Sequence, residues 1–165
     1  MIRQLLVIDQ AGAMTRHIEK IFGGFLKGYQ VLHAAGAEEA LGVARTEMID
    51  VIVINGDDLG KSLAYDIPTF LKKNIFPPAK LLLLLEPNLI NTLPALEGAV
   101  HAVVDSSNFR SHQFRRIVDK LIHVKYMEEK EKREKELEEK KDRSRRVWAK
   151  IDMICDDLEK KSNSE

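Results

Sequence analysis

The chain has 165 residues, of which 44% are hydrophobic and 32% are charged, and its formal net charge at pH 7 is zero. That length allows one domain of ordinary size with an appendage, and the balanced charge, which also holds for residues 1–124 and 125–165 separately, gives no support for nucleic acid as a partner. The single cysteine, Cys155, excludes an intrachain disulfide and a cysteine-based metal site, and the longest apolar run, residues 81–85, is too short to cross a bilayer.

Five short apolar runs each predict a strand. Runs this short and continuous are typical of strands that are buried on both faces of a parallel sheet covered by helices. The first run starts close to the N-terminus, with no charged leader and no long apolar segment before it, so we expect a cytoplasmic protein without membrane insertion. In chain order the predicted strands are residues 5–8, 29–33, 51–54, 81–85 and 100–104.

The segments between these strands have apolar residues at helical spacing. Their alternation with the strands predicts an α/β fold with a doubly wound, five-stranded parallel sheet of order 2-1-3-4-5. Gly23 and Gly24 weaken the first helix toward its end, and Pro68 is expected to kink the third helix or to mark its start. The predicted helices are residues 14–25, 36–45, 61–74, 88–96 and 110–124.

After residue 124 the pattern changes to a highly charged segment, residues 125–165, which we treat as a second region. No glycine or proline follows Gly98, and six acidic residues each stand four positions before a basic one. Each such pair stabilises a helix by about 0.2–0.5 kcal/mol, so we predict a long helix that continues the fifth; disorder is the alternative, because charge-rich segments often lack structure. The pairs are Glu128/Lys132, Glu129/Arg133, Glu131/Lys135, Glu136/Lys140, Glu139/Arg143 and Asp142/Arg146.

A short apolar seam near the end of the chain predicts self-association. Its spacings of four, three and four are those of a coiled-coil heptad, Leu137 keeps the same register, and Trp148 flanks the seam. An exposed apolar stripe needs a cover, so we predict a homodimer through this helix, with docking onto another protein or onto the first domain as alternatives. The basic residues 140–146 are interpreted as a solvated helix face. The seam consists of Val147, Ile151, Ile154 and Leu158.

Over residues 1–124 the order and spacing of the elements resemble the response-regulator receiver (CheY-like) family. The first strand ends at Asp9 and Gln10, the third ends at Asn55, and Gly98 and Ala99 precede the fifth. In that family the residue that closes the third strand is the aspartate that accepts a phosphoryl group, and an acidic pair after the first strand holds Mg²⁺. The resemblance implies a module of two-component signalling, with a pocket made here by Asp9, Gln10, Asn55, Asp57, Glu86 and Asp105.

Several positions depart from the family pattern. Asn55 replaces the acceptor, and a neutral amide oxygen is a far poorer nucleophile than a carboxylate. Gln10 replaces the second acid, which would leave a weak Mg²⁺ site. By the resemblance, Leu85 or Glu86 also stands in place of a hydroxyl residue, Ala102 in place of the switch aromatic, and Asp105 in place of the lysine that pairs with the phosphoryl group. We therefore predict a non-catalytic pseudo-receiver, not an enzyme, without a cofactor, that acts on another signalling protein independently of aspartate phosphorylation.

Three other interpretations stay open. If Asn55 does not occupy the acceptor position, the chain could be an active phosphorelay receiver. A pseudo-receiver of this kind could also bind a small molecule, although no particular residue argues for it. The carboxylates Asp9 and Asp57 are weak candidates for a cation site, but we favour a polar loop over residues 57–60 whose acids, Asp57 and Asp58, cap the third helix. The five histidines show no metal-ligand spacing.

Overall fold

The computed structural model describes residues 2–23, 28–75, 78–90 and 98–162, without the side chains of residues 58–65, 90 and 155–162. Two compact units make up the chain, Met1–Lys125 and Tyr126–Glu165. The first unit contains all the strands, and the second is helical through residue 162.

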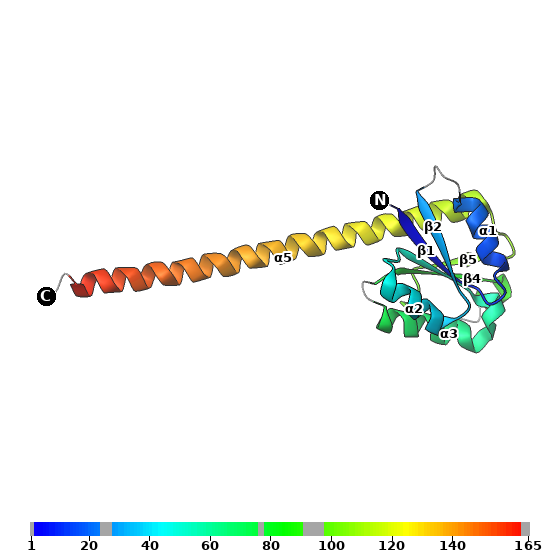
Figure 1. Ribbon diagram of the computed structural model, residues 1–165, viewed down its shortest axis with the longest axis horizontal. Coiled ribbons are helices and arrows are strands. Elements are labelled where there is room, and N and C mark those ends of the chain that lie inside the picture. The colour runs from blue at the N-terminus through cyan, green and yellow to red at the C-terminus, as the bar shows by residue number, and fades with distance from the viewer. Residues whose placement is uncertain (1, 24–27, 76–77, 91–97, 163–165) are drawn as a thin grey trace. The chain divides into compact units, whose positions relative to one another are not determined.

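A parallel sheet forms the centre of the first unit (Figure 1). Its strands lie in the order β2-β1-β3-β4-β5, and every neighbouring pair is parallel, which confirms the predicted topology. All residues of β3 and β4 are buried, because these central strands are covered on both faces. The strands are β1 (Arg3–Ile8), β2 (Tyr29–Ala34), β3 (Val51–Asn55), β4 (Lys80–Leu85) and β5 (Ala102–Asp105).

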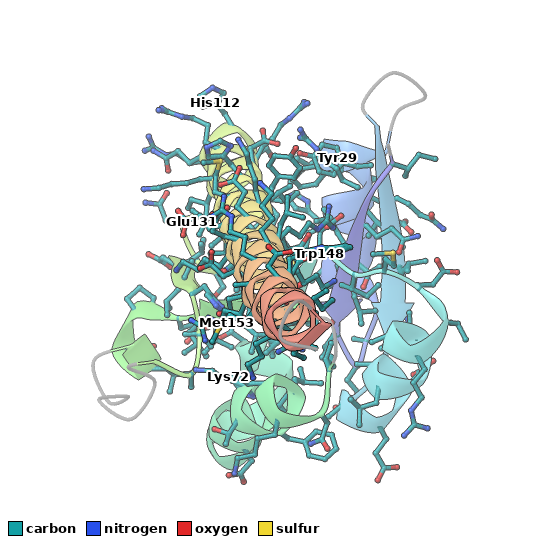
Figure 2. The ribbon with its side chains drawn as sticks, turned by 90° about the vertical axis from the view of Figure 1, so that its left-hand side faces the viewer. Tyr29, Lys72, His112, Glu131, Trp148 and Met153 are labelled. Carbon is teal, nitrogen blue, oxygen red and sulfur yellow. The ribbon has the colours of Figure 1, made fainter. Side chains whose placement is uncertain are left out.

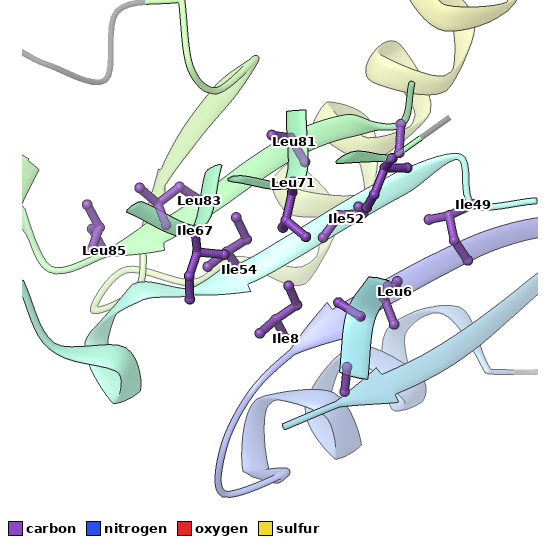
Figure 3. Close-up of a cluster of buried hydrophobic side chains, with 14 residues drawn as sticks. Leu6, Ile8, Ile49, Ile52, Ile54, Ile67, Leu71, Leu81, Leu83 and Leu85 are labelled. Carbon is purple, nitrogen blue, oxygen red and sulfur yellow. The ribbon is translucent and has the colours of Figure 1, made fainter. Parts of the chain in front are cut away.

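Helices cover both faces of this sheet. Alternate residues of the strands point to opposite sides, so that Leu5 and Val7 of β1 contribute to one core and Leu6 and Ile8 to the other. The first core includes side chains of α1 (Ala13–Phe22) and of α5 (Ser111–Ser162). The second core includes side chains of α2 (Ala37–Thr46) and of α3 (Gly56–Asn74), and Figure 3 shows buried side chains of this core.

Several predicted element boundaries were wrong: the first strand starts at Arg3 and not at residue 5, the first helix ends at Phe22 and not at residue 25, and two further differences bear on the site. The third helix starts at Gly56, directly after β3, so residues 57–60 belong to a helix and not to a polar loop, and Pro68 lies inside that helix. The fifth strand starts at Ala102 and not at residue 100. His101, just before it, still bonds to β4, because its main-chain N–H donates to the oxygen of Leu81 at 2.8 Å and its Nδ1 accepts the Leu81 N–H at 3.0 Å.

The fourth helix is only partly described. α4 covers Pro87–Ile90. Most of the helix predicted over residues 88–96 falls on residues 91–97, which lie outside the described part of the chain. The first helix ends at Phe22, ahead of Gly23, in line with the weakening expected from the two glycines.

A buried lysine closes the end of the sheet where the strands begin. Lys125 Nζ donates to the main-chain oxygen of Ile49 at 2.9 Å and lies 3.0 Å from Asp50 Oδ1. The other carboxylate oxygen of Asp50 accepts the N–H of Gln4 at 3.0 Å. Since a buried charge is tolerated only when it is paired and hydrogen-bonded, this group ties α5 to the starts of β1 and β3.

The second unit is a continuation of α5, which confirms the predicted long helix. Residues 130–154 are all exposed. Ion pairs along the helix include Glu129 with Arg133 at 3.9 Å and Lys130 with Glu134 at 3.8 Å, while Asp142 pairs with Arg145, three residues on, at 3.4 Å. Among the described residues, no helix is both long and apolar enough to cross a membrane.

Candidate functional site

The predicted pocket lies where β1 and β3 end. These strands are hydrogen-bonded neighbours with Ile8 opposite Ile54, so the next residue of each, Asp9 and Asn55, come to the same edge of the sheet. Asp9 is fully buried and Asn55 is only 6% exposed. The topology therefore brings together the two residues that the sequence singled out most strongly.

The Asp9 carboxylate is held by hydrogen bonds from the chain itself. Its Oδ2 accepts the main-chain N–H of Thr15 at 2.9 Å and the Thr15 hydroxyl at 3.4 Å. Thr15 lies in the first turn of α1, whose N-cap residue, Gly12, makes no side-chain cap. Asp9 supplies that cap instead, and its negative charge is favourable beside the positive end of the helix dipole.

Asn55 faces this carboxylate with its amide nitrogen. Nδ2 donates to Asp9 Oδ1 at 3.4 Å. The amide oxygen Oδ1 is buried and has no hydrogen-bond partner among the described residues, and a buried unpaired acceptor costs about 1–3 kcal/mol. An aspartate at this position would instead place a second negative charge against Asp9.

Gly56, which the sequence analysis did not single out, packs tightly behind the pocket. A Cβ atom at Gly56 would lie 2.9 Å from the main-chain oxygen of Leu84 and would overlap the side chain of Leu85. Only glycine permits α3 to start this close to β4. The signal available in the sequence was a glycine directly after a buried strand, where the chain must turn sharply into a helix.

The remaining predicted pocket residues are engaged locally. Asp57 Oδ1 accepts the N–H of Glu86 at 3.0 Å, which links the first turn of α3 to the end of β4. Asp105 Oδ1 accepts the Ser107 hydroxyl at 2.6 Å and the Ser107 N–H at 2.8 Å. The hydroxyl of Ser107 is the main reason why the pKa of Asp105 is lowered. Gln10 and Glu86 are exposed.

These contacts define what the pocket can do chemically. Asp9, Asp57 and Asp105 each accept main-chain N–H groups, so their carboxylates stabilise turns and helix ends. No group of three or more His, Cys, Asp or Glu side chains in the described part of the chain could hold a metal ion, and the side chain of Asp58 lies outside that part. The two weak metal candidates thus have different partners, because the Asp9 carboxylate is held by the first turn of α1 and the Asp57 carboxylate by the main chain at Glu86.

The comparisons with known proteins identify the fold. A response regulator from Thermotoga maritima is 18% identical with a TM-score of 0.61, over 74% of this chain and 99% of that one. A CheY-like response regulator receiver domain protein from Methanospirillum hungatei JF-1 is 16% identical with a TM-score of 0.57, over 78% and 99%. The chain has a receiver fold. No protein-family model matches the sequence, and no curated protein matches it.

Receiver folds also occur among sensors that are not ordinary response regulators. A structure described as a novel family of redox sensors in the streptococci, evolved from two-component response regulators, is 14% identical with a TM-score of 0.61, over 78% of this chain and 54% of that one. Because all these identities are below 25%, the likeness concerns the fold, and the receiver family's chemistry has to be judged from the residues of this chain.

The predicted seam lies on the second unit. Leu137, Val147, Trp148, Ile151 and Ile154 are all exposed, by fractions between 41% for Ile151 and 62% for Trp148. Trp148 and Met153, which is also exposed, are labelled in Figure 2. The side chain of Leu158, the last predicted seam residue, lies outside the described part of the chain.

Proposed function

We propose that this protein is a non-catalytic pseudo-receiver, a signalling module that acts through protein–protein contacts and is independent of aspartate phosphorylation. The observation that supports it most is the contact between Asn55 and Asp9. In a receiver fold the residue that ends β3 would be the phosphoryl acceptor, and here it is a buried amide that donates to a carboxylate.

Neither residue is suited to phosphoryl transfer. An amide oxygen is a weak nucleophile and does not form the acyl phosphate that a carboxylate forms. Asp9 would be the metal-binding acid, yet its two oxygens accept bonds from Thr15 and Asn55. Asp57 is exposed in the first turn of α3 and already accepts the Glu86 N–H. The two carboxylates that would hold a cation are therefore already engaged in hydrogen bonds within the chain.

The second part of the proposal is dimerisation through the C-terminal helix. The seam residues Val147, Ile151 and Ile154 are exposed and recur at spacings of four and three on one face of α5. Pairing with a second copy would bury this stripe, and it would leave the first unit available to another signalling protein.

Incubation with acetyl phosphate and Mg²⁺, followed by intact-protein mass measurement, tests the proposal. We expect no phosphoryl adduct on the wild type. The Asn55→Asp variant shows whether a carboxylate at the end of β3 can accept the phosphoryl group. The matched control is Asp57→Asn in the otherwise wild-type chain, which shows whether the nearby Asp57 accepts it instead. A stable adduct on the wild type that is lost in Asp57→Asn would show that the receiver is active and that Asp57 is its acceptor.

A further inference from the structure

A basic cavity lies between α1 and the start of α5, and none of its residues belongs to the pocket around Asn55. Its volume is about 410 Å³, which falls in the range of small-molecule sites. The two helices pack on the same face of the sheet through Ile18 and Phe22 of α1 and Phe114 and Val118 of α5. The lining residues are His17, Lys20, Ile21, Ser111, His112 and Arg115.

The nitrogen-bearing side chains of this cavity come from two distant parts of the sequence. His17 and Lys20 stand on α1, while His112 and Arg115 stand on the first turns of α5, where Figure 2 labels His112. Among the residues that the structure describes, no acid lines the cavity, and none lies in the first turn of either helix. The histidines show no metal-ligand spacing along the chain, and that spacing does not reveal that α1 and α5 meet.

The surrounding charges leave this cavity basic. The nearest acid on α5 is Asp119, whose Oδ2 lies 3.9 Å from Arg115 Nε, but its Oδ1 is bound by Arg3 at 3.1 Å and by the Tyr29 hydroxyl. On α1, Glu19 lines an adjoining hollow together with Arg16, and Lys20 lines both hollows. The start of α5 also contributes partial positive charge, because the first N–H groups of a helix have no partner within it.

One wall of the cavity is held in place by aromatic packing. The His17 ring meets the edge of Phe109 with centroids 5.0 Å apart, and Phe109 packs on the buried Phe114 at 4.7 Å. Ile21 adds an apolar surface beside the charged groups. A rigid wall of this kind lowers the entropy that binding must offset.

We propose that this cavity binds a small organic molecule that carries a phosphate group. The guanidinium of Arg115 can donate two parallel hydrogen bonds to phosphate oxygens, and the Lys20 ammonium adds a point charge. The Ser111 hydroxyl and the start of α5 supply the kind of donors that phosphates meet at helix N-termini. The organic part of the ligand would contact Ile21. The inference goes beyond the proposed scaffold function and does not depend on it.

A titration with inorganic pyrophosphate at constant ionic strength, followed by amide NMR signals, tests this site. We expect shifts confined to α1 and to residues 109–116, and an affinity lowered about tenfold or more in Lys20→Gln and Arg115→Gln. The matched control is Arg45→Gln, an exposed arginine of α2, which should bind as the wild type does. Unchanged thermal melting shows that each variant is folded.

Several results would contradict the proposed phosphate site. One is the absence of NMR shifts in α1 and α5 at millimolar pyrophosphate. Another is an equal loss of affinity in the control Arg45→Gln, which would indicate non-specific electrostatic binding. If citrate, a carboxylate anion, binds as tightly as pyrophosphate, the site does not select phosphate groups and the proposal is wrong. A short RNA that binds through Lys20 and Arg115, and that pyrophosphate does not displace, would mean a nucleic-acid surface instead. The Asn55→Asp variant should bind pyrophosphate normally, which separates this test from that of the scaffold function.

Discussion

At the scale of single residues, Asn55 offers a neutral hydrogen-bond donor to the buried carboxylate of Asp9. Asp9 is fully buried, and its carboxylate is satisfied by the first turn of α1 and by the amide of Asn55. A receiver that binds a cation must keep several carboxylates close together, and these repel one another until the metal arrives. In this chain the amide removes that repulsion.

The Asn55→Asp variant should be less stable at neutral pH, by about 1–3 kcal/mol. The new carboxyl would face Asp9, so its pKa in the folded state would be raised above that in the unfolded state. The variant would then approach wild-type stability in mild acid and lose stability as the pH rises through the raised pKa. Urea unfolding at several pH values measures the stability of the variant relative to the wild type, and a difference that is the same at pH 8 as below the unfolded aspartate pKa of about 3.9 would contradict the assigned contact.

Gly56 carries a second prediction at this scale. Gly56→Ala should destabilise the fold by about 1–3 kcal/mol, because the added Cβ would overlap Leu85 and press on the oxygen of Leu84. The matched control is Gly42→Ala in α2, where nothing lies within 4 Å of the new atom, and which should stabilise the helix by up to about 1 kcal/mol. Thermal unfolding compares the two variants, and equal effects would refute the close packing at Gly56.

At the scale of elements, the heptad register explains why only the end of α5 is suited to pairing. Continued toward the N-terminus from Val147, the seam positions are occupied by Ser144, Lys140, Leu137, Arg133 and Lys130. In a parallel pair of identical helices, the lysines and the arginine would each face their own copy, which is unfavourable. Leu137, which the predicted seam included, therefore stands between Arg133 and Lys140, and we expect the continuous contact to begin only at Val147.

This register gives a prediction about oligomeric state. Ile151→Asp should abolish the dimer, because it places a charge in the middle of the apolar stripe. Leu137→Asp, the matched control on the same exposed helix, should reduce dimerisation much less. Sedimentation at several concentrations measures both. If Leu137→Asp disrupts the dimer as strongly as Ile151→Asp, the pairing extends over the charged half and the assigned seam is too short.

At the scale of the whole molecule, the fold could be predicted from the sequence because its main determinants are local. The short apolar runs and the helical spacing between them predicted five parallel strands in the observed order. Where α3 and β5 start could not be predicted in the same way. Gly56 starts a helix because of a close approach to β4 that no local pattern reveals, and His101 contacts β4 before the fifth strand begins.

The position of the pocket could be predicted from the sequence, but the hydrogen bonds of its side chains could not. Adjacent parallel strands that end at the same edge placed Asp9 beside Asn55, as the topology required. That Asp57 contacts Glu86, and that Asp105 organises its own turn, depends on side-chain orientation at helix and strand ends. The basic cavity between α1 and α5 could not be predicted, since it arises only where residues about 95 positions apart meet.

The most direct test of the central claim is the mass of the full chain in solution by light scattering, with and without Mg²⁺ and acetyl phosphate. We predict a dimer whose mass does not respond to the phosphodonor, because an amide at Asn55 does not accept a phosphoryl group and the seam on α5 is exposed for pairing without one. A monomer that dimerises only when Mg²⁺ and acetyl phosphate are both present would contradict the account and would identify an active receiver.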